Sequence, residues 1–300
     1  MMSADTMEQQ VSVLKQHKRR SQAAEVWHRM KKNRGAMLGL AIVILLAVVA
    51  LGAGFFFDYE TDVIGQDMSI RLQSPSAEHW MGTDQFGRDI YARLIYGSRY
   101  SLSVGIVAVA VGLLFGVVLG ATAGYCGGII ENIIMRAADM LAAIPSILTA
   151  IVVVSVLGQS FFNLMLAVGI TSIPQFIRIT RAAVITVRDQ EYIEASRAIG
   201  LRDPEIIAWH ILPNCISPII VQTTLRVATA IVTASSLSFL GLGIPQPSPE
   251  WGSMLSLGRR FIRDYSYMTF FPGLAIMITV LALNLLGDGL RDALDPKLKK

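Results

Sequence analysis

The length, composition and charge of the chain exclude a soluble globular protein. Its 300 residues are 53% hydrophobic and only 16% charged, and the mean hydropathy is +0.53, which places the chain in a bilayer. The net charge of +4 does not indicate a nucleic-acid partner, because membrane proteins collect Lys and Arg in their cytoplasmic segments. Cys126 and Cys215 fit neither a metal-ligand spacing nor a paired bridge, so no metal site is expected.

The apolar runs predict an all-α, polytopic membrane protein with six transmembrane helices. A helix rises about 1.5 Å per residue, so roughly 20 apolar residues cross the hydrocarbon core. The run from Met140 to Ile177 spans 38 residues, which is too long for one crossing, and Gly158-Gln159-Ser160 is the natural turn within it. The predicted spans are residues 35–57, 101–124, 138–157, 161–180, 215–240 and 267–287.

These spans divide the chain into two tails and one membrane domain. Residues 1–34 form the predicted N-terminal tail, residues 35–290 the transmembrane domain and residues 291–300 the C-terminal tail. The segment from Gln22 to Arg34 mixes apolar side chains with a basic face, which suits either the inner membrane surface or a solvated tail. The first apolar run lacks a small-residue cleavage pattern, so an uncleaved anchor is predicted.

The basic residues predict which side of the membrane each loop occupies. When the six spans alternate in direction, the segments on one side carry 18 Lys and Arg residues and those on the other side carry 7. Cytoplasmic segments are the ones enriched in basic residues. We therefore expect both termini to be cytoplasmic.

Small residues recur at every fourth position of the second span. Such a ridge lets another helix approach closely, either within the bundle or in a partner subunit. Membrane helices are generally rich in glycine, but five small residues in register favour the packing role. They are Ala108, Gly112, Gly116, Gly120 and Gly124.

The loop of residues 188–213 carries the signals of two short helices. Asp189 is placed to cap a helix over residues 190–199, and Gly200 is placed to end it in a left-handed conformation. An Asp-Pro pair beginning at Asp203 then starts a second helix. Two helices with a glycine corner are therefore expected to project into the cytoplasm.

One stripe of the first short helix is composed of small and apolar side chains. Tyr192, Ala195, Ser196 and Ile199 share this stripe at helical spacing. Such side chains on a loop outside the membrane indicate a docking surface. The alternative is that the stripe packs back onto the bundle.

The same loop resembles a known motif. Glu194-Ala195-Ser196, with Gly200 beyond it and Leu212-Pro213 further on, is similar to the EAA motif of bacterial binding-protein-dependent ABC import permeases. In that family the loop forms a coupling helix that sits in a cleft of the ATPase subunit. The sequence departs from the motif at Ser196, which replaces the second Ala, and at His210, where an Ile is common. The docking residues that the resemblance implies are Tyr192, Glu194, Ala195, Ser196, Ile199 and Gly200.

Further segments resemble the C-type permease of dipeptide and oligopeptide importers. The resemblance implies a type I ABC importer permease fold and the transport of short peptides across the bacterial inner membrane. Importers of glutathione or of nickel complexes remain alternatives. The matching segments are Gly82–Asp89 with Arg93, Gly97 and Arg99–Leu102, then Leu237–Gly243 and Pro249–Leu255, and finally Asn284–Pro296.

The resemblance also implies partners: a second, homologous permease subunit, two ATP-binding subunits, an extracytoplasmic solute-binding protein and membrane lipid. A nucleotide-binding P-loop needs a lysine after glycine and before Ser or Thr, and none of the seven lysines has that context. ATP hydrolysis is therefore expected on the partner subunits, which would bind ATP and Mg, and no cofactor or catalytic residue is expected in this chain.

The sequence disfavours two other classes of membrane protein. An ion-coupled secondary transporter usually carries acids or histidines within its spans, whereas the acids here, such as Asp139 and Asp288, are predicted at span edges. An intramembrane enzyme would need a nucleophile with a base, or a metal cluster, at membrane depth. The sequence contains neither arrangement.

One charge does fall inside a predicted span. Arg226 is near the middle of the fifth span, where an unpaired cation is costly and usually faces a water-filled cavity or a partner. It is a candidate for the translocation path, as a counter-charge for a substrate carboxylate. A structural ion pair or a hydrogen bond to backbone carbonyls at a subunit interface is the alternative.

Overall fold

The computed structural model describes residues 22–294, and within this range all regular elements are helices. Parts of the predicted tails, residues 1–21 and 295–300, therefore lie outside the described residues. Five helices are long and apolar enough to cross a membrane, and a bent pair would make a sixth span. The five are α3 (Arg34–Phe56), α4 (Ile90–Cys126), α7 (Phe161–Ile185), α10 (Ile216–Phe239) and α12 (Tyr267–Leu294).

The remaining helices are shorter. The bent pair is α5 (Gly128–Ala143) and α6 (Ser146–Leu157). Outside the spans lie α2 (Gln22–Lys32), α8 (Glu191–Ala198), α9 (Asp203–Glu205) and α11 (Trp251–Gly258). Single helical turns occupy Tyr59–Val63, Met68–Ile70, Ile206–Ile211, Leu212–Asn214 and Arg259–Phe261.

The third predicted span differs from the structure. It was expected as one helix over residues 138–157, but α5 starts ten residues earlier and the axis turns by 88° between α5 and α6. The break falls at Pro145, which cannot donate a backbone hydrogen bond, and the residue before a proline is driven out of the helical region. Ile144 accordingly has φ −88° and ψ 131°. The predicted fold-back is confirmed at Gly158, which has φ 86°.

The second span is longer than predicted. Helix α4 has 37 residues, about 56 Å of helix, and it starts at Ile90 where the sequence predicted a loop. Asp89 caps it by accepting a 2.9 Å hydrogen bond from the Ala92 amide. The first turns of α4 therefore extend beyond the apolar stretch and reach the loops at one end of the bundle.

The ridge of small residues on α4 packs against α7 in the same chain, and this is the most extensive helix pair in the described structure. A Cβ on Gly112 would lie 2.7 Å from the Ser172 Cβ, and one on Gly120 would lie 2.6 Å from the Ile177 carbonyl oxygen. Real side-chain atoms do not approach so closely. Gly116 and Gly124 make equally close approaches to α7.

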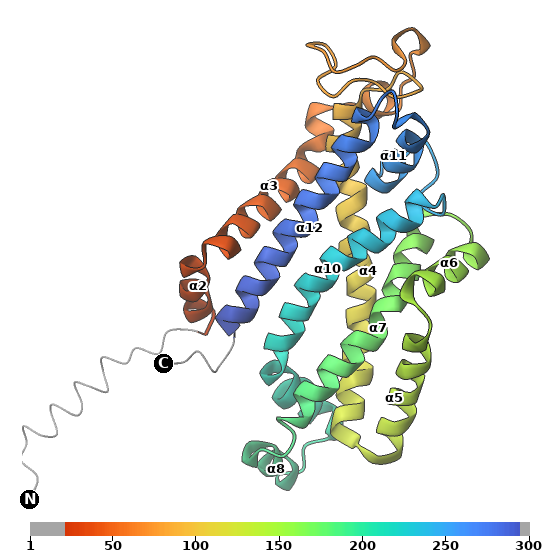
Figure 1. Cartoon of the computed structure of the whole chain (residues 1–300). Coiled ribbons are helices and arrows are strands. Elements are labelled where there is room, and N and C mark those ends of the chain that lie inside the picture. The colour runs from red at the N-terminus through yellow and green to blue at the C-terminus, as the bar shows by residue number, and fades with distance from the viewer. Residues whose placement is uncertain (1–21, 295–300) are drawn as a thin grey trace, which may run out of the picture.

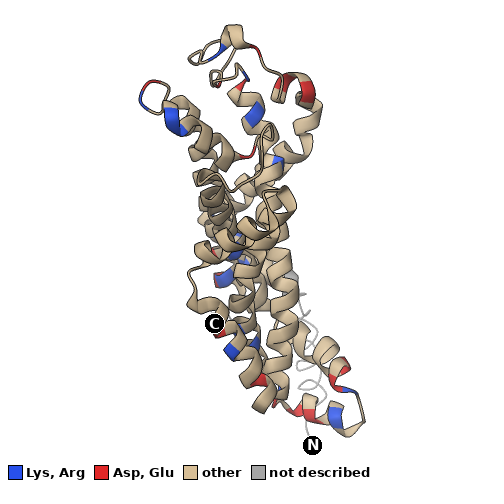
Figure 2. Cartoon of the chain, turned by 90° about the vertical axis from the view of Figure 1, so that its right-hand side faces the viewer, with Lys and Arg blue, Asp and Glu red and all other residues tan. Residues whose placement is uncertain are grey.

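The two ends of the bundle carry different elements. We call the end that carries α2 and α8 the α8 end, and the opposite end, with residues 57–89 and 240–266, the loop end (Figure 1). Both ends of the described chain lie at the α8 end (Figure 1). Charged residues gather toward both ends (Figure 2), as expected for a bundle whose middle lies in lipid.

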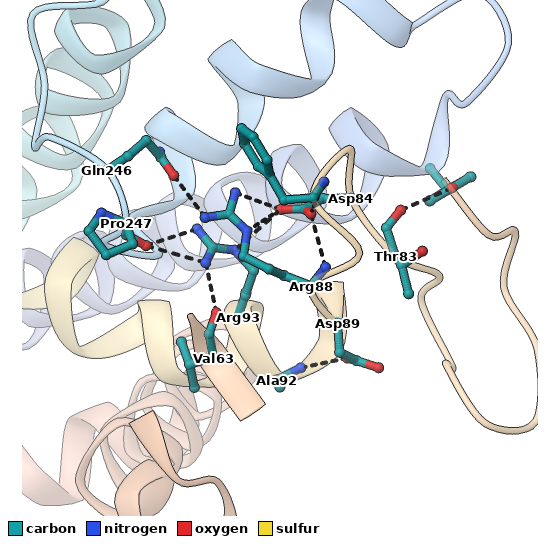
Figure 3. Close-up of polar contacts among 11 residues, drawn as sticks. Val63, Thr83, Asp84, Arg88, Asp89, Ala92, Arg93, Gln246 and Pro247 are labelled. Atoms are coloured by element: carbon teal, nitrogen blue, oxygen red, sulfur yellow. Dashed lines mark hydrogen bonds and ion pairs between the residues drawn. The ribbon is translucent and has the colours of Figure 1, made fainter. Parts of the chain in front are cut away.

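At the loop end, buried charged residues hold the segment before α4 (Figure 3), beside an apolar cluster that includes Leu72 and Met81. Asp84 accepts a 2.6 Å hydrogen bond from Arg88 Nε, and Arg88 Nη1 donates to Gln246 at 3.0 Å. Arg93 Nη1 donates to the carbonyls of Val63 at 2.8 Å and of Pro247 at 3.3 Å. This network joins the two loops at that end to the start of α4.

Helix α11 was not predicted, because residues 241–265 had the pattern of a loop. Glu250 caps it and is only 1% exposed. Its carboxylate accepts hydrogen bonds from the amides of Gly252 at 2.8 Å and Ser253 at 2.7 Å. Burial raises the pKa of Glu250, and these hydrogen bonds oppose the rise.

Candidate functional sites

The first candidate site is the pair of short helices that projects from the α8 end. Helix α8, Glu191–Ala198, was predicted over residues 190–199. Gly200 follows it with φ 86° and is confirmed as the left-handed corner. The predicted cap is wrong: Gln190 occupies the cap position without a side-chain bond, and Asp189 instead lies 3.4 Å from Arg188 Nε.

The predicted stripe on α8 is divided between two environments. Tyr192 is 43% exposed and Ile199 is 79% exposed, and Ala195 between them is exposed. Ser196, by contrast, is only 6% exposed, and its hydroxyl donates to the Tyr192 carbonyl at 2.7 Å. Ser196 therefore belongs to the inner face of α8, and a docking face would consist of the other side chains, with Glu194 and Gly200 also exposed.

The inner face of α8 packs on the chain itself. Ile193 is fully buried among residues from α4, α7 and the turn before α10, including Tyr125, Val184 and Ile211. Arg188 fixes the start of the projection by donating from Nη1 to the Gly124 carbonyl at 2.8 Å. The projection is thus attached to the ends of two long helices, so a displacement of α8 acts directly on α4 and α7.

A polar contact connects α8, α4 and α9. The Tyr125 hydroxyl donates to Asp203 at 2.7 Å, and Arg197 Nε donates to the same hydroxyl at 3.2 Å. Asp203 is the first residue of α9, and Arg202 holds the cap position. Sequence reasoning missed Tyr125 and Arg197, because the three segments are far apart in the chain and carry no shared local pattern.

The second candidate site is a cavity of about 290 Å³ beside Arg226. Arg226 is the eleventh residue of α10, Ile216–Phe239, so it lies near the middle of that span. Its Nη2 donates to the Thr171 carbonyl at 3.3 Å, while its buried Nε has no hydrogen-bond partner among the described residues. The cavity is lined by Leu141, Ala142, Ile144, Pro145, Ser146, Thr149, Ile170, Thr171, Pro174, Gln175, Arg178 and Arg226.

One acid near this cavity, Asp139, is placed differently from the sequence prediction. Asp139 was expected at the edge of a span, but α5 begins at Gly128, so Asp139 lies inside the helix. It pairs with Arg178 at 2.8 Å. Within residues 22–294 no group of three His, Cys, Asp or Glu side chains is placed to hold a metal ion.

Several apolar spans define a multi-pass membrane protein, and the projecting helix pair and the cavity at mid-span are its two candidate sites. Residues 116–300 match the family described as binding-protein-dependent transport system inner membrane component. Residues 21–75 match the N-terminal TM domain of oligopeptide transport permease C. The chain belongs to the family of binding-protein-dependent transport system inner membrane components, which confirms the resemblance of its loop motif.

Individual relatives agree with this assignment. The chain is 48% identical over 275 residues to the dipeptide transport system permease protein DppC of Alkalihalophilus pseudofirmus, covering 92% of this chain and 90% of the relative. It is 44% identical over 275 residues to the glutathione transport system permease protein GsiD of Pectobacterium atrosepticum, covering 92% and 91%.

A solved structure supports the fold. The inward-facing MetNI methionine ABC transporter matches with a TM-score of 0.55 and 17% identity, covering 68% of this chain and 96% of that one. The predicted importer permease fold is confirmed.

Proposed function

We propose that this chain is one permease subunit of an ATP-driven importer that carries short peptides across the bacterial inner membrane. Membership of the permease family over residues 116–300 carries the proposal. The permease C domain at residues 21–75 and the dipeptide permease relative favour peptides as the substrate. A complete transporter would add a second permease subunit, two ATP-binding subunits, which bind ATP and Mg, and an extracytoplasmic solute-binding protein.

The exposed face of α8 is the proposed site for an ATP-binding subunit. Tyr192, Ala195 and Ile199 present apolar and small side chains outside the long helices, and such a surface is suited to burial against a partner. The inner face of α8 is packed on α4 and α7. Closure of the ATP-binding subunits would therefore be transmitted through α8 to the membrane helices.

The α8 end is the proposed cytoplasmic side. It carries α2, whose last turn has Arg29, Lys31 and Lys32, and basic residues favour the cytoplasm. The loop end would then receive the solute-binding protein.

Glutathione is the second candidate substrate, because a glutathione permease is 44% identical to the chain. The test is uptake by proteoliposomes that contain the chain with its genomic neighbours, supplied with the neighbouring binding protein and internal ATP. We expect uptake of labelled dialanine that depends on ATP and on the binding protein. Uptake of glutathione but not of dialanine would favour the second candidate, and uptake of neither would contradict the proposal.

A further inference from the structure

The guanidinium of Arg226 is incompletely satisfied in the middle of a span. Of its three nitrogen atoms, only Nη2 has a partner among the described residues, at 3.3 Å, which is a long hydrogen bond. The Nε atom is buried without a partner. An arginine in the bilayer interior is expensive unless an acceptor reaches it, so its position beside a cavity indicates that the acceptor enters from outside this chain.

The cavity lining supplies no carboxylate to this guanidinium. Its lining has two arginines, Arg178 and Arg226, and no Asp or Glu. Arg178 is already paired with Asp139, so Arg226 is the cation left for a ligand. Thr149 and Gln175 add polar groups to the same wall.

The break between α5 and α6 makes the cavity more favourable for an anion. Ile144, Pro145 and Ser146 line it, so the N-terminus of α6 opens at its wall. This terminus has no side-chain cap, and the first amides of a helix carry a partial positive charge. The guanidinium of Arg226 and the start of α6 therefore both favour an anion in this cavity.

We propose that this cavity is a carboxylate-binding site of the translocation path, in which Arg226 pairs with the free carboxylate of a peptide. The site deepens the proposed function, on which it rests, by naming the group that the permease itself recognises. A planar guanidinium binds a carboxylate through two parallel hydrogen bonds. The volume of about 290 Å³ is near the lower end of ligand pockets, roughly 300–1,000 Å³, and suits one end of a short peptide.

The experiment uses the complete transporter in nanodiscs without the binding protein, so that only the membrane subunits are probed. Saturation-transfer NMR compares dialanine with dialaninamide, which has the same shape but no carboxylate. We expect the wild type to bind dialanine about tenfold more tightly than dialaninamide. This ratio is at the lower end of what a hydrogen bond to a charged group contributes to affinity. Arg226→Met should remove this preference, and Arg226→Lys should keep part of it, because the charge persists without the planar geometry.

The matched control is Arg136→Met. Arg136 is an exposed guanidinium on α5 that does not line the cavity, so its removal should leave the preference unchanged. A wild type that binds both compounds equally would overturn the proposal, as would an Arg226→Met transporter that retains the preference. The rival explanation is an acid on the second permease subunit; it predicts equal binding by the wild type and loss of assembly in Arg226→Met, with recovery in Arg226→Lys.

Parallel uptake measurements separate this site from the proposed function. If wild-type proteoliposomes import dialanine with ATP but the nanodisc complex shows no carboxylate preference, the site is wrong and the peptide importer stands. If the preference is present and depends on Arg226 but no peptide is imported, the site stands and the peptide assignment is wrong.

Discussion

The hydroxyl of Tyr125, in the last turn of α4, donates a 2.7 Å hydrogen bond to the carboxylate of Asp203 in α9. The Arg197 guanidinium of α8 lies 5.0 Å from the centre of the same tyrosine ring and donates to its hydroxyl. One side chain therefore holds both projecting helices to the end of a membrane helix. We infer that Tyr125 positions the projection and does not itself contact an ATP-binding subunit.

Tyr125→Phe tests this positioning role. The substitution keeps the ring beneath Arg197 but leaves Asp203 without its donor, and a hydrogen bond to a charged group is worth about 1.5–3 kcal/mol. We expect normal co-purification of the ATP-binding subunits but several-fold less peptide imported per ATP hydrolysed. Tyr91→Phe is the control, because Tyr91 lies in the first turn of α4, at the opposite end of that helix, where its ring contacts Phe57 and Trp80. An unchanged ratio of import to hydrolysis in Tyr125→Phe would contradict the inference.

Ala195→Arg tests the proposed docking face. Ala195 is exposed on α8, so the isolated chain has room for an arginine there. In the complex that arginine would either be buried without a charged partner or push the ATP-binding subunit away from α8. We expect the variant to insert into the membrane at wild-type levels and to lose most ATP-binding subunits during purification. Asn132→Arg, exposed on α5, is the control. Normal co-purification with normal substrate-stimulated hydrolysis in Ala195→Arg would remove the docking assignment.

The native cysteines test the orientation. Cys126 is exposed and is the last residue of α4, next to the Tyr125 that contacts α8 and α9. An impermeant maleimide should therefore label it only after the membrane is opened. Cys215 is buried, so a bulky maleimide should not reach its thiol in the folded protein. In a Cys126→Ser background, a cysteine at Ser76 should react from outside intact cells. Labelling of Cys126 from outside would reverse the orientation.

Asp84→Asn tests the buried network at the loop end. Asp84 is 6% exposed, and Arg88 and Arg93 beside it are 2% and 1% exposed. Removing one charge of a buried set leaves the others uncompensated, at about 3–5 kcal/mol. We expect a clearly lower apparent melting temperature of the purified complex. Glu78→Gln, at an exposed position, should leave it unchanged, and equal melting of the two variants would show that the network does not stabilise the fold.

The sequence predicted the features that depend on local pattern. Apolar length located the long helices, and the glycine corner at Gly200 followed from the conformational freedom of that residue. Pro145 was visible in the sequence, but a proline can kink a membrane helix or break it, and the 88° turn depends on how α6 packs. The cavity beside Arg226 depends on this turn, so only the cation itself could be predicted.

Contacts between distant segments could not be predicted. The stripe on α8 was identified from spacing, but Ser196 turns inward because Ile193 beside it enters a cluster built from α4 and α7. Asp84 and Arg88 have the composition of a solvated loop, and they are buried where the two loops of the loop end pack together. Glu250 has the same composition but is buried as the cap of α11. Hydrophobic periodicity carries no information on such pairing.

The ridge of small residues on α4 provides a prediction with an internal control. A Cβ on Gly116 would overlap the Phe176 Cβ and lie 3.0 Å from the Ile173 carbonyl oxygen. Both are fixed parts of α7, so Gly116→Ala must separate α4 from α7. We expect a loss of about 1–3 kcal/mol, typical of overpacking, seen as a lower apparent melting temperature and a reduced yield of assembled complex.

Gly273→Ala makes the same chemical change where space is available. The nearest atom to a Cβ on Gly273 of α12 is the Leu255 Cδ2 at 3.8 Å, an ordinary van der Waals distance. Alanine is favoured over glycine within a helix by about 1 kcal/mol, so this variant should melt at or above the wild-type temperature. If close helix packing is the role of the ridge, only Gly116→Ala should therefore lower the melting temperature. Equal shifts would indicate that the glycines of α4 reflect only the general composition of membrane helices.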